Sequence, residues 1–235
     1  MAKVSLTAGE DVNASGRVAE KIKEFFPGAI TNKALVQKVS EALKKYNYGK
    51  NSLVATSLCT DEVNRCLESE FVKSYGDAFS IGGLSGFPFG GSTAFGNMAS
   101  HIPQGESALI VFAPHVGVDS EGNIGTVDRR GRTKGGPCCD SAIAASEYVL
   151  SVHKGTAKAK DSPNNLLDAQ QSFVEKMLLP HAGRLEASAN TMVELPYALY
   201  DSQKELITDI ISTAAGAVSG DGKIAVLGGI EINTP

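Results

Sequence analysis

The sequence lacks the features that define several common classes of protein. No apolar run approaches the length of a membrane-spanning helix, and no charged-then-apolar leader follows Met1. The net charge of -4 gives the chain no general attraction for nucleic acid. Neither an internal repeat of solenoid length nor a low-complexity tract occurs. We therefore expect no membrane span and no nucleic-acid partner.

Two motifs with a defined chemistry are also absent. The phosphate-binding pattern GxxxxGK[ST] does not occur, so the glycine-rich stretch 79–91, FSIGGLSGFPFGG, favours an apolar pocket wall over a nucleotide loop. No CxxC pair occurs, and the adjacent Cys138 and Cys139 could pair only through a strained ring. A thiol-redox protein is therefore the less favoured alternative. Cys66, one position before an apolar helix residue, is interpreted as a small core side chain.

What the chain does contain is an alternation of buried strands and amphipathic helices. At 235 residues and 42% hydrophobic content it can form one large α/β domain. The runs LVATSL (53–58) and ALIVFA (108–113) are typical of strands covered on both faces. We predict an α/β fold with a central, mostly parallel sheet flanked by helices, and with helical additions at both termini. Residues 1–50 would form an N-terminal helical arm and residues 51–235 the α/β domain of one compact protein.

The spacing of apolar residues, together with capping and turn residues, predicts further elements. The sequence predicts helices near 18–26, from a cap at Thr31 to 46, from 61 to 75, over 95–102, after Cys139, and over 167–179 and 202–218. Residues 119–125 predict a hairpin turn whose second strand returns over 127–132, and residues 223–232 a last single strand. The basic cluster Arg129, Arg130, Arg132 and Lys134 is interpreted as a solvated hairpin or a subunit contact.

Metal-ligating side chains stand where three of these elements meet loops. Cys59 follows the first buried strand, and His115 follows the second after a proline. Open α/β sheets place their chemistry at the carboxyl ends of strands, so the two side chains would converge if the strands are neighbours. Cys138 and Cys139 open a helix, whose free amides and dipole favour a thiolate. Two cysteines and one histidine fill three corners of a tetrahedral zinc site, which leaves one for water.

Asp61 and Arg65 stand beside the first of these ligands. Asp61 could be a fourth ligand that closes the site, or it could accept a hydrogen bond from a zinc-bound hydroxide. Arg65, one helical turn later, could hold Asp61 off the metal through a carboxylate–guanidinium pair. The alternative for both residues is a helix cap and a helical ion pair. His101, near the end of its helix, is a surface or capping residue and only a weak proton-shuttle candidate.

Five ordered segments and a sixth near the end carry a resemblance to a known family. They read SLCTDEVNR, GGLSGFPFGG, TAFGNMASHIP, PHVGVDSEGNIGTVDRRGR, GGPCCDSAIAA and GGIEINT. Together they resemble the limiting-CO2-inducible protein B/C family of algae and diatoms, whose active members are called theta-type carbonic anhydrases. That family is similar in fold to beta-type carbonic anhydrases, which carry CxDxR and HxxC motifs. Cys59 and Asp61 match the first motif, but the arginine falls later, at Arg65. A hairpin separates His115 from Cys139, which takes the place of the second cysteine.

The resemblance implies a function and a set of roles. Zn2+ would be held by Cys59, His115 and Cys139, with Cys138 as the rival of Cys139. The reaction would be the reversible hydration of CO2 to bicarbonate by a zinc-bound hydroxide, catalysed by a lyase that acts as a homodimer. Asp61 would orient the hydroxide and Arg65 would orient Asp61. The pocket for CO2 would be lined by Phe87, Phe89 and Val116.

The same resemblance implies a setting and an alternative. A photosynthetic CO2-concentrating mechanism and a chloroplast location are expected from the family alone. Some members keep the ligands without detectable activity, so the alternative is a catalytically silent, zinc-stabilised subunit of a CO2-concentrating assembly.

Overall fold

Four parallel strands form the central sheet. The computed structural model describes residues 16–46, 48–160, 166–214, 216, 218 and 222–235. The spatial order of the strands is β2, β1, β3, β7. Their bounds are β1 Leu53–Leu58, β2 Ala78–Ser80, β3 Ala108–Ala113 and β7 Ile224–Gly228. Every residue of β3 is buried, which explains its unbroken apolar sequence. The predicted α/β architecture with a parallel sheet is confirmed.

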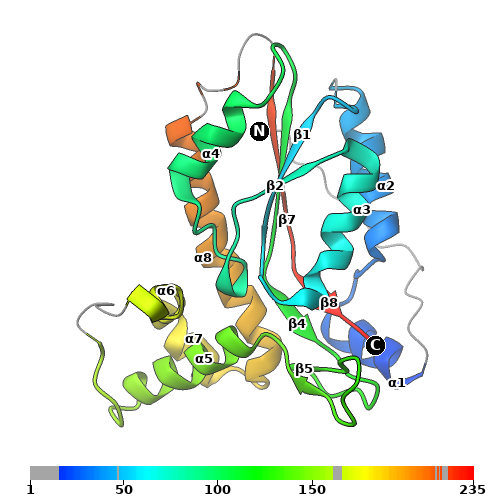
Figure 1. Ribbon diagram of the computed structural model, residues 1–235. Coiled ribbons are helices and arrows are strands. Elements are labelled where there is room, and N and C mark those ends of the chain that lie inside the picture. The colour runs from blue at the N-terminus through cyan, green and yellow to red at the C-terminus, as the bar shows by residue number, and fades with distance from the viewer. Residues whose placement is uncertain (1–15, 47, 161–165, 215, 217, 219–221) are drawn as a thin grey trace.

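Helices cover both faces of this sheet (Figure 1). One face carries α2 (Asn32–Lys44) and α3 (Arg65–Tyr75), and the other carries α4 (Gly91–Ser100) and α8 (Thr191–Ala214). On the first face Leu67 and Phe71 pack against strand residues such as Val54, and on the second Phe95 and Ile207 pack against Ile110. Each helix buries the apolar stripe that its spacing indicates. Cys66 is exposed, so its prediction as a core residue was wrong.

The N-terminal helices pack onto the rest of the chain. The side chain of Thr31 accepts a hydrogen bond from the Ala34 amide and caps α2, as predicted. Helix α1 (Arg17–Phe25) buries Val18 and Ile22 against Val116 and neighbouring residues. Residues 1–15 of the predicted arm lie outside the described residues, and the division of the chain at residue 50 stays a prediction.

A second group of helices lies at the carboxyl end of the sheet. Figure 1 shows α5 (Asp140–His153), α6 (Ala169–Leu178) and α7 (Ala182–Ala187) gathered beside the lower part of α8. Short 3-10 turns join the elements: η1 Glu62–Asn64, η2 Leu84–Gly86, η3 Leu166–Asp168 and η4 Leu179–His181. The apolar core of this group includes Cys59, Phe87 and Cys139, so the helices form one wall around the ends of the strands. None of the described helices combines the length and apolarity that a membrane span requires.

The last strand differs from its prediction. Instead of one strand over 223–232, the chain forms β7 and then β8 (Glu231–Asn233), which pairs in parallel with β4 (His115–Gly117). The gap between β7 and β8 lies beside the gap between their partner strands, β3 and β4. Pro114 interrupts the path from β3 to β4 and provides no amide donor. The amide of Gly229 then donates to the Phe112 carbonyl and that of Glu231 to the Pro114 carbonyl. The chain therefore forms two parallel pairs, β3 with β7 and β4 with β8, and the strands of both pairs are interrupted at the same level.

The observed bounds of other elements also differ from the predicted ones. Helix α8 begins at Thr191 and runs through Pro196, so the predicted start at residue 202 was too late and the predicted end at 218 lies beyond the observed one. The predicted helix over 167–179 is α6, which is shorter at both ends. In the hairpin region, β5 (Thr126–Val127) pairs antiparallel with β6 (Gly136–Pro137), and the turn between them carries the basic cluster.

Close approach of two backbones explains one glycine of the sequence. A methyl group on Gly82 would lie 2.3 Å from the Leu58 carbonyl oxygen and 2.6 Å from the Leu58 nitrogen. Both are atoms of β1 and cannot move without disturbing the sheet. We expect Gly82→Ala to lower the free energy of unfolding by about 1–3 kcal/mol in a denaturant titration.

The matched control is Gly96→Ala within α4. Apart from the chain neighbours and the backbone of the same helix, no described atom lies within 4 Å of a methyl group built at Gly96, so this change should raise the free energy of unfolding by up to about 1 kcal/mol. Equal effects of the two substitutions would contradict the close approach of Gly82 to β1.

Candidate metal centre

Three buried side chains converge at the carboxyl ends of β1 and β3. Because the two strands are paired from Leu53 with Ala108 to Leu58 with Ala113, Cys59 and the β4 residue His115 emerge at the same edge of the sheet. Cys139 reaches them from the start of α5. The ligand atoms of Cys59, His115 and Cys139 all lie within 4.8 Å of one another, and the two sulfurs are 3.7 Å apart. The structure therefore brings together the three side chains that the sequence singled out.

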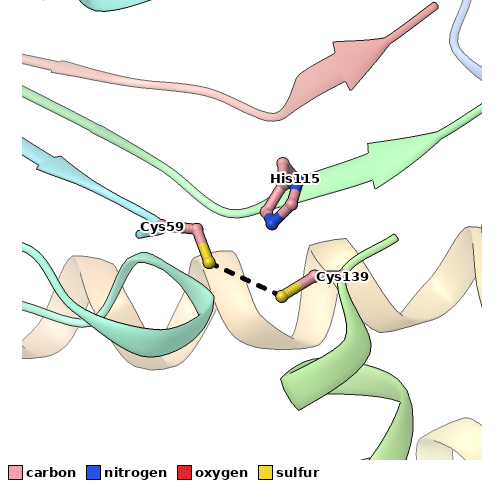
Figure 2. Close-up of side chains that lie close together, drawn as sticks. All are labelled: Cys59, His115 and Cys139. Carbon is pink, nitrogen blue, oxygen red and sulfur yellow. Dashed lines mark hydrogen bonds between the residues drawn. The ribbon is translucent and has the colours of Figure 1, made fainter. Parts of the chain in front are cut away.

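The imidazole of His115 is held in one orientation by Asn233. The Nδ1 atom lies 2.7 Å from Asn233 Oδ1, and the Asn233 amide nitrogen donates to the Val63 carbonyl at 3.3 Å. Since Oδ1 can only accept, Nδ1 carries a proton, and Nε2 is the ring nitrogen left for a metal ion. Nε2 is buried and has no hydrogen-bond partner among the described residues. Figure 2 shows a ring nitrogen of His115 pointing toward the two sulfurs, as a metal ligand would.

Cys138 lies on the other side of the imidazole. Its sulfur is 3.4 Å from His115 Nδ1 and donates to Asn233 Oδ1, also at 3.4 Å. Together with Asp61 and His115 it forms a second cluster of ligating atoms within 4.8 Å. In that cluster the Nδ1 atom is already engaged by Asn233, whereas Cys139 lies with Cys59 near the free Nε2. The geometry favours Cys139 over Cys138 as the third ligand.

Protons are shared among the three converging side chains. A hydrogen bond with Cys139, together with burial, raises the pKa of the Cys59 thiol, and the same bond lowers the pKa of Cys139 despite its burial. Burial opposes a charge on His115, but the neighbouring sulfurs of Cys138 and Cys59 outweigh this effect and raise its pKa to about 11. A divalent cation held here would displace these protons, so its apparent affinity would increase with pH.

The partner of Asp61 is Arg129, not Arg65. Both nitrogens Nη1 and Nη2 of Arg129 donate to the two carboxylate oxygens of Asp61, at 2.9 and 2.8 Å. Burial opposes the charge of Asp61, yet the hydrogen bonds from Arg129 lower its pKa to about 2. Arg65 instead donates to the Cys59 carbonyl at 2.6 Å and to Glu68. The predicted Asp61–Arg65 pair was wrong because η1 precedes α3 and Asp61 caps this turn, so the two residues do not lie one α-helical turn apart.

The sequence indicates for Arg129 only a solvated hairpin or a subunit contact. Its neighbours Arg130, Arg132 and Lys134 are indeed exposed, but the Arg129 side chain turns inward from the hairpin. The hairpin inserted between His115 and Cys139 therefore supplies the arginine that the CxDxR pattern lacks in this chain. No spacing rule could have selected Arg129 from the basic cluster, because its contact crosses between separate elements.

The predicted pocket residues separate into two groups. Phe87 is fully buried beside Cys59 and Cys139, and Phe89 packs with it and with Phe173 at ring-centroid distances of 6.3 and 5.2 Å. Val116 packs instead against α1. Successive residues of a strand point to opposite sides, so Val116 cannot face the same space as His115. Only the two phenylalanines lie on the side of the sulfurs.

Of two further titratable residues, His101 matches its prediction as a surface residue, whereas Glu231 was not predicted. His101 is exposed and contacts the Phe79 ring, at a centroid distance of 5.9 Å. Glu231, which the sequence did not single out, is buried opposite His115 in the β4–β8 pair. Burial raises the pKa of Glu231 to about 8, although the charges of His115 and Arg65 oppose this shift. It therefore adds little negative charge to the site at neutral pH.

A comparison with known protein families finds one that matches most of this chain. The family described as limiting CO2-inducible proteins B/C, beta carbonic anhydrases, matches residues 29–235. The chain belongs to the limiting CO2-inducible protein B/C family. The match covers every residue of the metal centre, and the resemblance read from the sequence motifs is confirmed.

Solved structures agree with this assignment. PtLCIB4, a homolog of the limiting CO2-inducible protein LCIB, is 50% identical, with 92% of this chain and 89% of that chain covered and a TM-score of 0.87. A histidine-to-alanine mutant of PtLCIB4 is 48% identical over 94% of this chain and 88% of that chain, with a TM-score of 0.88. LCIB itself is 22% identical over 90% and 86% of the two chains, with a TM-score of 0.68, and shares the fold. No protein with curated annotation matches this chain.

The orientation of His115 by Asn233 leads to a test in this member of the family. We expect Asn233→Ala to weaken zinc binding roughly 10- to 100-fold, because the imidazole loses the acceptor that fixes its tautomer. Competition with a chromogenic chelator measures the affinity. Asn51→Ala, which removes an exposed amide bonded to Glu106, is the control and should leave the affinity unchanged. An unaltered zinc affinity in Asn233→Ala would show that Asn233 does not orient the ligand.

The Asp61–Arg129 pair leads to a second test, through the dependence of stability on pH. The folded-state pKa of Asp61, about 2, lies below the ordinary value of about 4, so the pair contributes stability above pH 4 that is lost as the pH falls toward 2. Arg129→Ala should lower the free energy of unfolding at pH 7 by roughly 1–2 kcal/mol, with allowance for solvent screening. The difference from wild type should shrink between pH 5 and 2 in denaturant titrations.

Arg130→Ala is the control for this titration because Arg130 belongs to the same hairpin but its side chain is exposed. Its difference from wild type should not shrink over the same pH range. A deficit in Arg129→Ala that stayed constant from pH 7 to 2 would contradict the assignment of the pair.

Proposed function

We propose that this protein is a zinc-dependent carbonic anhydrase, a lyase that interconverts CO2 and bicarbonate. The observation that carries the proposal is the convergence of two buried cysteines and a histidine whose Nε2 has no partner among the described residues. The donor set suits zinc, which takes sulfur and nitrogen ligands in tetrahedral sites. Membership of a carbonic anhydrase family supports the substrate.

Cys59, His115 and Cys139 would hold the zinc ion. A zinc ion with three protein ligands supplies a Lewis acid that makes hydroxide available at neutral pH. The Nε2 atom supports this assignment, since a buried ring nitrogen without a hydrogen-bond partner is unfavourable unless a ligand satisfies it. The buried thiols, which share protons with the imidazole, would become thiolates on binding.

Asp61 is the proposed acceptor that orients the attacking oxygen, and Arg129 is the residue that positions Asp61. Two hydrogen bonds from Arg129 occupy the carboxylate and hold it ionised, which leaves its remaining lone pairs to accept a proton donor. The same bonds disfavour a direct bond between Asp61 and the metal, so they argue against a closed site. Arg65, bonded to the Cys59 carbonyl, would fix the loop that carries the first ligand.

The apolar side of the site suits an uncharged substrate. Phe87 and Phe89, with Phe173 packed against both, surround the sulfur side of the centre with aromatic surface. Apolar walls exclude water and strengthen the interactions of charged groups with the reacting atoms. We place CO2 on this side.

We also propose that the protein acts as a homodimer in the chloroplast, within a photosynthetic CO2-concentrating mechanism. Both proposals derive from family resemblance. All five residues of β7, at the edge of the sheet, are partly exposed, which is compatible with a subunit contact. Sedimentation equilibrium would test the dimer, and imaging of the tagged full-length protein in a photosynthetic cell would test the location.

The decisive test of activity compares two substitutions in stopped-flow CO2 hydration with zinc quantified in the same samples. Asp61→Asn should keep zinc near one ion per chain and lose at least about 100-fold in hydration rate, because the proton acceptor is removed and the ligands are not. Cys59→Ala should lose zinc and hydration together.

Glu62→Gln is the matched control. Glu62 also accepts from Arg129 but is exposed, so neither zinc content nor rate should change. An active Asp61→Asn enzyme would refute the role of Asp61. Wild-type protein that holds zinc and shows no hydration would refute the enzyme and favour the alternative, a catalytically silent, zinc-stabilised subunit.

A further inference from the structure

Ser85 has a backbone conformation that its residue type rarely adopts. At φ 55° and ψ 12° it is the only described residue other than glycine with a positive φ. The left-handed region is unfavourable for a side chain with a Cβ atom, by about 1 kcal/mol or more. Gly83 precedes this short turn and Gly86, which also has a positive φ, ends it, yet position 85 between them is a serine whose side chain is buried. We therefore expect the side chain of Ser85 to have a role that offsets the unfavourable backbone conformation.

The surrounding structure holds the turn in place from three elements. The Gln203 amide of α8 donates to the Ser85 carbonyl at 2.7 Å, and the Ser57 hydroxyl of β1 donates to the Gly86 carbonyl at 2.8 Å. A methyl group on Gly86 would lie 2.8 Å from the Ala113 carbonyl oxygen of β3, so the turn lies directly against the ends of both central strands. Ser85 therefore cannot relax without disturbing these contacts.

The turn presents the Ser85 hydroxyl to a metal ligand. Its Oγ lies 3.7 Å from Cys139 Sγ and 3.1 Å from Ser141 Oγ. The Ser141 hydroxyl donates in turn to Gln171 at 2.7 Å, so Ser141 can accept the proton of Ser85. A thiol at Cys139 can donate to Ser85 while Ser85 donates to Ser141, but a thiolate can only accept. Once Cys139 is a thiolate, the stronger charge-assisted bond draws the Ser85 proton to the sulfur.

We propose that Ser85 is a positioning residue for the metal centre, whose hydroxyl donates to the Cys139 thiolate and sets how much charge this sulfur gives to a bound divalent cation. A hydrogen bond to a ligating sulfur withdraws electron density from it, and partners of this kind tune both metal affinity and the chemistry at the metal. The inference rests on the proposed metal site and assigns a role to the glycine-rich turn beyond that of a pocket wall.

The test uses Co2+ as a spectroscopic probe of the full chain. Thiolate-to-cobalt charge-transfer bands report directly on the electron density of the ligating sulfurs. In Ser85→Ala the bands should move to longer wavelength, and the affinity for Zn2+ should fall about tenfold. Ser85→Gly also lacks the hydroxyl but removes the backbone penalty, so it should be at least as stable as wild type and show the same spectral shift. If Ser85 acted only on folding, the two variants would differ in stability and would not share the spectral shift.

Ser141→Ala is the control for the neighbouring hydroxyl. It removes the competing acceptor of Ser85, so the bands should stay in place or move to shorter wavelength. Bands that do not shift in either Ser85 variant, or that shift in Ser141→Ala as they do in Ser85→Ala, would overturn the role of Ser85. Absence of charge-transfer bands in wild type would overturn the metal site itself, which distinguishes the two failures.

Discussion

The parallel pairing of β1 with β3 is the constraint on which the rest of the structure depends. Hydrogen bonds along the whole length of β1 align the ends of two buried strands, so the residues that follow them meet at one edge of the sheet. Cys59 follows one strand and Pro114–His115 the other. A shift of one residue in this register would turn His115 to the opposite side and separate it from the cysteine. Burial of every β3 side chain makes such a shift unfavourable.

Around this edge the chain builds its supporting hydrogen bonds from distant segments. Asn233 comes from the last strand, Arg129 from the hairpin inserted before the third ligand, and Ser85 from the glycine-rich turn. Each one contacts a single group of the site: the imidazole, the carboxylate or the third sulfur. Side chains that are held by such partners keep their orientation before any ligand binds, which reduces the reorganisation that binding or catalysis requires.

The two carboxyl groups near the site have pKa values that are shifted in opposite directions. Asp61 receives a bidentate arginine and is ionised throughout the neutral range, whereas Glu231, buried without a hydrogen-bond partner for its Oε2 in the described residues, favours the protonated form. Environment thus sets opposite protonation states for two residues near one histidine. Of the two, only Asp61 is suited to accept a proton donor at neutral pH.

The sequence by itself determined the α/β class, the two central strands and the three side chains that converge, because these depend on local apolar runs and on where each run ends. It also indicated the family through motifs that stay in order along the chain. Only the tertiary structure decided that Arg129 rather than Arg65 holds Asp61, that Val116 faces away from the centre, and that Asn233 and Ser85 support the ligands. Those contacts join segments separated by tens of residues, and local spacing carries no information about which distant side chain will fill a given site. For the third ligand, the resemblance already favours Cys139 over Cys138, and the engagement of Nδ1 by Asn233 adds a reason that the sequence does not contain.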